Sequence, residues 1–166
     1  HKECLKIALS RKDSQTKNYK CSPRLIPATK LVLNNGFCLN ALAPTKLAWS
    51  EMSRIISKGR QSAPKGQCNI NTKDLLEFGS NLILLIHPSE EAQKNKPSPD
   101  YWLNSCQKIV NSFRKNSFFL LNPLYDGQDH IRFKHLSKIS QDLCIPTIAS
   151  AAPLMHIGNR RKLTDI

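Results

Sequence analysis

The stretch from Ala41 to Gln67 limits the possible folds most, because its character changes twice within a few residues. It begins as an apolar segment typical of the end of a buried strand, and Pro44 breaks that strand. Thr45 is a candidate N-cap for a helix that ends at Lys58-Gly59. The predicted buried face of this helix consists of Leu47, Trp49, Met52, Ile55 and Ile56. A strand, a helix and a loop in this order form half of a βαβ unit.

The other apolar runs predict strands that alternate with helices. Asn34-Asn35-Gly36 lies between two short apolar runs and predicts a hairpin turn. The later predicted elements are a helix from Asn71 or Thr72 to Phe78, a strand at Leu82–Ile86, a polar loop at His87–Lys96, a helix from Ser98-Pro99-Asp100, a strand at Ser117–Leu121, a helix after Asp126-Gly127 and a strand at Thr147–Ala151. We therefore expect an α/β fold with a mostly parallel sheet, in which the strand at Leu82–Ile86 is buried on both faces.

The 166 residues are enough for one domain with its own core. We expect residues 1–23 to form a short helix or loop, and residues 24–166 to form the α/β domain, incomplete at both ends. The six cysteines are scattered without close-set pairs, which argues against a zinc ribbon and favours reduced thiols in a cytoplasmic protein. The longest unbroken apolar run, Leu82–Ile86, is too short to cross a bilayer, so no membrane partner is expected.

The formal net charge of +13 attracts polyanions such as nucleic acid or anionic lipid, without giving specificity. The candidate phosphate-binding residues are Lys58, Arg60 and Lys65 in the first basic loop and Arg160, Arg161 and Lys162 near the end of the chain. A solvated helix start and loop explain the same residues equally well. With DNA as the partner, we expect weak binding that is indifferent to sequence.

Two segments resemble a known family. The run LAPTKLAWSEMSRIISKGRQSAPKGQC, followed by Asp74-Leu75-Leu76, is similar to the polymerase-and-histidinol-phosphatase (PHP) domain of bacterial error-prone DNA polymerases, relatives of the polymerase III alpha subunit. The run IPTIASAAPLMHIGNRRKLTDI resembles the segment in which that domain meets the polymerase palm. The resemblance covers roughly Leu25 to Ile166. It implies a partial PHP-type (βα) barrel that lacks its first strand or strands.

In this family, His, Asp and Glu side chains at the carboxyl ends of the strands hold a metal cluster that hydrolyses phosphoesters. The family pattern has Glu where this chain has Lys30, and His where it has Leu124. Its Asp, apolar residue and His fall on Ala152, Pro153 and Leu154. A lysine and apolar side chains cannot bind a divalent cation. The resemblance therefore implies no catalytic residue, metal or cofactor in this chain, with magnesium belonging to the palm of the parent polymerase.

Three other motifs have simpler interpretations than catalysis. Pro99-Asp100-Tyr101-Trp102 is similar to the Pro-Asp-x-Asp motif of the palm, but Trp102 replaces the second acid, so helix capping is favoured. His130 and His135 are five positions apart, which places them on different sides of a helix, unlike the pair of zinc proteases. His156 matches a histidine of the family but lacks the neighbouring ligands.

Two functions remain open. In the first, the chain is a non-catalytic PHP-like part of an error-prone DNA polymerase that acts in translesion synthesis and repair. Its partners are then the palm and thumb, with the sliding clamp or accessory proteins as further contacts. In the second, the chain is a degenerate, stand-alone basic domain that binds nucleic acid without catalysis.

Overall fold

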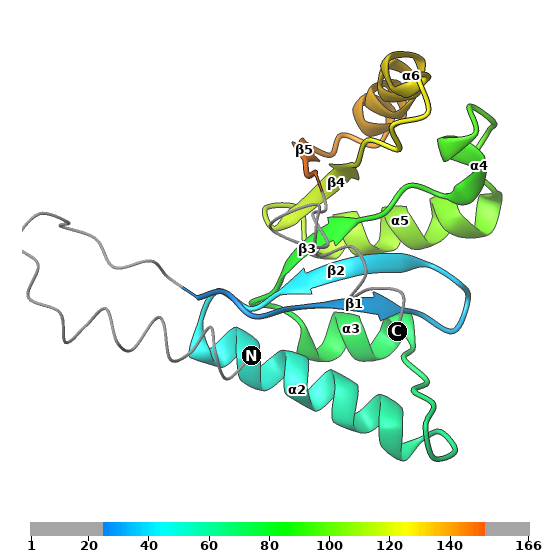
Figure 1. The fold of residues 1–166 in the computed structure, drawn as a ribbon. Helices are drawn as coiled ribbons and strands as arrows, with labels where there is room; N and C mark the ends of the chain where they lie inside the picture. Colours follow the sequence, from blue (N-terminus) through cyan, green and yellow to red (C-terminus); the bar gives the residue numbers. More distant parts are fainter. Residues whose placement is uncertain (1–24, 152–166) are drawn as a thin grey trace, which may run out of the picture.

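Five strands form one mixed sheet in the computed structural model, which describes residues 25–151 (Figure 1). The strands β1 (Ala28–Val32), β2 (Cys38–Leu42), β3 (Ile83–Ile86), β4 (Ser117–Leu121) and β5 (Thr147–Ala149) are hydrogen-bonded in that order. The helices are α2 (Lys46–Gln61), α3 (Thr72–Phe78), α4 (Glu90–Gln93), α5 (Asp100–Ser112) and α6 (Asp129–Asp142). The α/β prediction is confirmed, and the predicted polar loop after β3 contains the short helix α4.

The predicted hairpin joins β1 to β2. The two strands are antiparallel, with Leu31 opposite Leu39. The Gly36 N–H donates to Leu33 O at 2.8 Å, and Gly36 has a φ of 81°. No other residue of this turn has a positive φ, so only the glycine needs the left-handed region that β-carbons disfavour.

The sheet is not mostly parallel, which corrects the prediction. β1–β2 and β2–β3 are antiparallel, whereas β3–β4 and β4–β5 are parallel. The cause lies in the connection from β2 to β3, which holds two helices rather than one. Along α2 the chain runs to the hairpin end of the sheet, where Leu33 forms a β-bridge with Ile70. Along α3 the chain then runs back toward the opposite end of the sheet. The Asn81 N–H then lies 2.9 Å from Glu51 Oε2 in α2, so β3 starts beside the end of β2 and runs against it.

The helices cover one face of the sheet. α2 packs on α3, α3 on α5, and α4 on α6. The side chains on the covered face are almost fully buried, and one row across the sheet consists of Leu31, Leu39, Ile86 and Phe119. The next row belongs to the other face, hereafter the open face, and is exposed or half-buried: Lys30, Asn40, Leu85 and Phe118. β3 is therefore fully buried on one face only, in contrast to the prediction.

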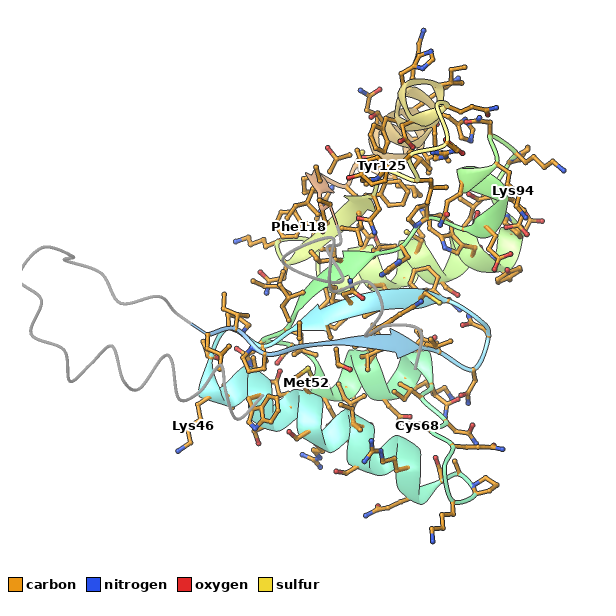
Figure 2. All side chains as sticks on the ribbon, in the orientation of Figure 1. Lys46, Met52, Cys68, Lys94, Phe118 and Tyr125 are labelled. Atoms are coloured by element: carbon orange, nitrogen blue, oxygen red, sulfur yellow. The ribbon has the colours of Figure 1, made fainter. Side chains whose placement is uncertain are left out.

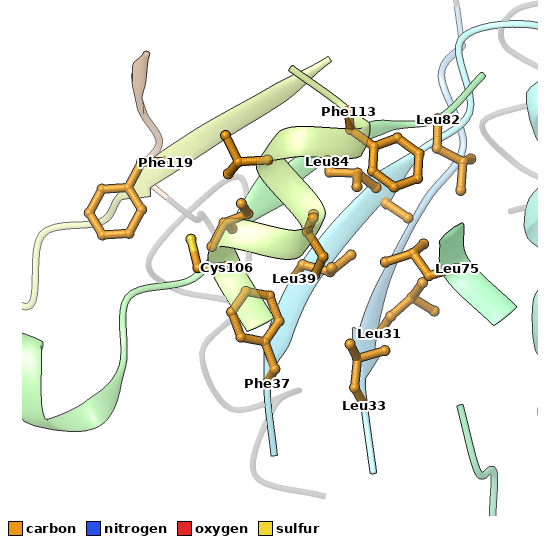
Figure 3. Packing of buried hydrophobic residues seen from close by; sticks show 14 of the residues in the cluster. Leu31, Leu33, Phe37, Leu39, Leu75, Leu82, Leu84, Cys106, Phe113 and Phe119 are labelled. Carbon is orange, nitrogen blue, oxygen red and sulfur yellow. The ribbon is translucent and has the colours of Figure 1, made fainter. Parts of the chain in front are cut away.

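An aromatic cluster links the hairpin, α5 and β4. The Trp102 ring lies 5.6 Å from the Phe37 ring and 6.1 Å from the Phe119 ring, measured between centroids. Figure 3 shows Phe37 and Phe119 beside α5, with Leu31 and Leu33 on the same side as Leu75 of α3. Burial raises the pKa of the nearby Cys106 thiol to about 12, so this cysteine is a packing residue rather than a nucleophile.

The buried face of α2 is narrower than its sequence suggests. Met52 and Ile55 are buried as predicted, but Leu47 is 59% and Trp49 44% exposed. Ala48 and Gly59 complete the buried seam. A β-carbon on Gly59 would lie 2.9 Å from Cys68 Sγ, so this glycine permits close packing instead of ending the helix, which continues to Gln61. None of the helices within residues 25–151 is long and apolar enough to span a membrane.

Candidate functional site at the carboxyl ends of the strands

Three polar side chains meet on the open face near the end of β3. Lys30 on β1 lies opposite Asn40 on β2 in the antiparallel register. His87 follows β3 directly, and its Nε2 lies 3.0 Å from Asn40 Oδ1. Because the amide oxygen accepts, this hydrogen bond places the imidazole proton on Nε2. The His87 N–H also donates to Cys38 O at 3.1 Å, which fixes the residue against the hairpin.

This environment disfavours a positive charge on His87. Burial lowers the pKa of the imidazole, and the positive charge of Lys30 lowers it further. His87 is therefore neutral at pH 7, and the fixed charge of the group is the Lys30 ammonium. Such a group can bind an anion or accept a hydrogen bond, but its ammonium repels a divalent cation.

We expect a pH-dependent stability from His87. The unfolded chain binds a proton at the ordinary histidine pKa of 6.5, whereas the folded chain resists protonation. The unfolded state thus holds more protons below that pKa, so the free energy of unfolding falls as the pH drops from about 7.5 to about 5. Urea titrations across this range should show a weaker fall in His87→Gln, which keeps a hydrogen-bonding side chain but does not titrate. Identical pH profiles would contradict the lowered pKa.

A pocket of about 340 Å³ adjoins His87. Its lining includes Gly36 and Cys38 from the hairpin, His87, Glu90 and Glu91 from the segment after β3, and Tyr101 from α5. Within residues 25–151, no group of three or more His, Cys, Asp or Glu side chains is placed to hold a metal ion. The described residues at this end of the sheet therefore do not form a ligand set of the size that a metal cluster needs.

The predicted positions of lost ligands fall partly in this region. Lys30 belongs to the group described above. Leu124 is 50% exposed in the loop that follows β4, and its N–H donates to Asp129 Oδ1 at 3.0 Å. Tyr125 lies in the same loop, and Phe118 lies on β4, the strand before this loop (Figure 2). β3 and β4 are parallel, so the segments that follow them leave the same edge of the sheet. Ala152 and Leu154 lie outside the described residues.

The basic residues at the end of α2 differ in their surroundings. The Lys58 ammonium lies 2.6 Å from Asp74 Oδ1 and 3.8 Å from Glu77 Oε2. This hydrogen bond raises the pKa of Lys58 and lowers that of Asp74. Lys58 also lies over the Phe78 ring, 4.9 Å from its centroid, so its side chain joins α2 to α3.

Arg60 and Lys65 are exposed and form no ion pair with any described residue. Lys65 lies in the turn in which the Gln67 N–H donates to Pro64 O at 3.0 Å. The structure thus leaves two of the three predicted cations of this loop available to a partner. Arg160, Arg161 and Lys162 lie outside the described residues.

The motifs with simpler interpretations have structural roles. Pro99 is the N-cap position of α5 and Asp100 its first residue, one position later than predicted. In α6, His130 is exposed and His135 half-buried, with the His135 Nε2 3.3 Å from Lys96 O. Within residues 25–151, the two histidines share no hydrogen-bond partner. His156 lies outside the described residues.

The hydrogen bond between His87 and Asn40 was not predicted from the sequence. Their contact depends on the antiparallel register of β2 and β3, which local patterns do not specify. One signal was present: Asn40 is a polar residue within an apolar strand, and His87 follows an apolar run without a break. Polar side chains at such positions of an α/β sheet commonly belong to a site.

Comparison with curated proteins finds relatives over most of the chain. An error-prone DNA polymerase of Ruegeria pomeroyi is 29% identical over 145 residues, which are 87% of this chain and 12% of that protein. Error-prone DNA polymerases of Sinorhizobium medicae and Vibrio parahaemolyticus are 26% and 25% identical, over 84% and 99% of this chain. The chain spans only 12% and 15% of the length of those two relatives. No protein-family model matches the sequence.

Proposed function

The chain is homologous to one segment of the error-prone DNA polymerases, and on this premise we propose that it is a non-catalytic, PHP-like part of such a polymerase. Its role is structural: it supports the palm and thumb, where the magnesium-dependent synthesis across damaged templates takes place. The clamp and accessory proteins are further contacts of the assembled polymerase.

The arrangement of the sheet supports a PHP-type barrel segment. Helices cover one face, and the two parallel units β3–α5–β4 and β4–α6–β5 follow one another as in the wall of a (βα) barrel. The open face then corresponds to the barrel interior. β1 and β5 are the outer strands of the described sheet, and they are the positions at which neighbouring strands of a complete barrel would pair.

One observation carries the non-catalytic assignment: the Lys30 side chain lies on the open face beside Asn40 and contributes to the lowered pKa of His87. A carboxylate at this position would neutralise a divalent cation, whereas the ammonium repels it. Among the described residues, His87 belongs to no group of three or more His, Cys, Asp or Glu side chains placed to hold a metal ion, as a metal-dependent phosphoesterase requires.

As part of a DNA polymerase, the chain would lie close to DNA, which is a polyanion. Arg60 and Lys65 can contact phosphates directly, and Arg160, Arg161 and Lys162 add to the positive charge. Contacts of this kind are weak, independent of sequence and lost when salt is added. The availability of Arg60 and Lys65 equally supports the second candidate function, a stand-alone basic domain that binds nucleic acid without catalysis.

Hydrolysis assays with the full chain test the proposal. We expect no release of product from single-stranded DNA or from a phosphomonoester in the presence of Mn²⁺, Mg²⁺ or Zn²⁺. Metal-dependent hydrolysis that disappears in His87→Gln would overturn the non-catalytic assignment. Binding of the full chain to an error-prone DNA polymerase lacking the matching segment separates the two candidate functions, because only a polymerase part is expected to associate.

A further inference from the structure

We propose that a basic pocket at the opposite edge of the sheet binds a phosphate group. The pocket has a volume of about 240 Å³ and lies where α5 turns into β4. Its polar lining consists of Ser80, Asn111, Ser112, Arg114, Lys115 and Asn116. This site goes beyond the proposed structural role, because it lies at the amino ends of β3 and β4, away from His87 and from the first basic loop.

The charge of the pocket favours an anion. Arg114 and Lys115 are exposed neighbours, and neither forms an ion pair or a hydrogen bond with any described residue. Glu51 is an acidic residue that contacts the lining. Its carboxylate accepts hydrogen bonds from Ser80 Oγ, from the Asn81 N–H and from Asn81 Nδ2. Among the described residues, Glu51 forms no ion pair with Arg114 or Lys115. A metal ion is disfavoured by the same pair of positive charges.

The turn that carries Arg114 and Lys115 is anchored to the core at both ends. Phe113 is 5% exposed, and its N–H closes α5 by donating to Ile109 O at 2.8 Å. Asn116 O accepts from the Leu84 N–H at 2.7 Å, which ties the other end of the turn to β3. Between these anchors, the main-chain N–H groups of Arg114 and Lys115 have no acceptor among the described residues. Two free amides next to two cations suit the several acceptor oxygens of a phosphate.

Phosphate could come from two sources, the backbone of DNA or a free phosphate compound. The test therefore titrates the full chain, labelled with ¹⁵N, with inorganic phosphate, a mononucleotide and a single-stranded oligonucleotide. We expect saturable shifts of the Arg114 and Lys115 amide signals with each probe. Tighter binding of the oligonucleotide, with competition by inorganic phosphate, identifies the DNA backbone. Equal affinity for the oligonucleotide and the mononucleotide identifies the free compound.

The double variant Arg114→Gln/Lys115→Gln should lose these shifts. For the oligonucleotide, its slope of log affinity against log salt should fall by up to about two units. Lys134→Gln/Lys138→Gln removes the same charge from exposed positions of α6 and serves as the matched control, with an unchanged slope expected.

An alternative role for Arg114 and Lys115 is to offset the negative end of the α5 dipole. In that case the double variant would lower the melting temperature but leave phosphate binding intact, and the proposal would be wrong. Absent amide shifts in the unmodified chain would overturn it as well.

Discussion

Replacement of Phe119 by alanine is expected to lower the free energy of unfolding by about 3–5 kcal/mol, the usual cost of removing a buried aromatic ring. Phe119 is fully buried on the covered face, and its ring packs edge-on against Trp102. The cavity would form where β4, β3 and α5 meet, so neighbouring side chains cannot easily fill it. Urea unfolding of both proteins measures the difference.

Phe118 provides a matched control, because it directly precedes Phe119 in the same strand and faces the open side. Phe118→Ala removes an identical ring from a half-buried position, and we expect less than half the loss seen at Phe119. Equal losses at the two positions would show that both faces of β4 are packed alike. That result would contradict a sheet with one covered and one open face.

Arg132→Met should have the second-largest effect. The Arg132 side chain is only 4% exposed, is ion-paired with Asp126 and Asp129, and donates through Nε to Gln93 O at 2.9 Å. Removing the guanidinium leaves the two carboxylates without their ion-pair partner and removes one hydrogen bond between α6 and α4. A broken buried ion pair typically costs about 3–5 kcal/mol, and we expect about 2–4 because Asp126 is 46% exposed.

Two measurements support the interpretation of this variant. Lys134→Met removes an exposed cation from the same helix and should change stability by no more than about 0.5 kcal/mol. In the unmodified chain, the hydrogen bond from Arg132 lowers the pKa of Asp126, so part of the stability is lost as the pH falls below the ordinary value of 3.8. Arg132→Met should not show this additional loss of stability at acid pH. An unchanged acid profile would mean that the ion pair contributes nothing in solution.

Local signals explain why most elements were predictable. The Asn34-Asn35-Gly36 turn, the Thr45 cap and the start of α5 near Pro99 are each encoded within a few residues. The apolar runs of β3 and β4 also stood out, because strands in a sheet with a covered face must exclude polar side chains there. These features do not depend on how distant segments pair.

Features set by distant contacts were not predictable. The antiparallel pairing of β2 with β3 depends on the return path through α3, and this path also decides which face of β3 is covered. In α6, the exposed Ile131 and the buried Arg132 reverse the expectation from hydrophobicity, because Arg132 finds its carboxylate partners in the folded chain.

The candidate site likewise combines a feature that is visible in the sequence with contacts that depend on distant segments. The replacement of the expected acid by Lys30 could be seen in the sequence through the family resemblance. Its place beside Asn40 and His87 could not, since it requires the register of three strands. The ion pairs of Lys58 with Asp74 and Glu77 were equally hidden, because they join two helices across a long loop.

Titration of the full metal-free chain with Mn²⁺ and Zn²⁺, followed by calorimetry, tests directly whether the open face of the sheet can hold a metal ion. With the Lys30 ammonium in place of a carboxylate, we predict no saturable, stoichiometric binding at the open face, and no difference between the unmodified chain and His87→Gln. Tight binding of at least one metal ion per chain that is lost in His87→Gln would contradict the non-catalytic assignment.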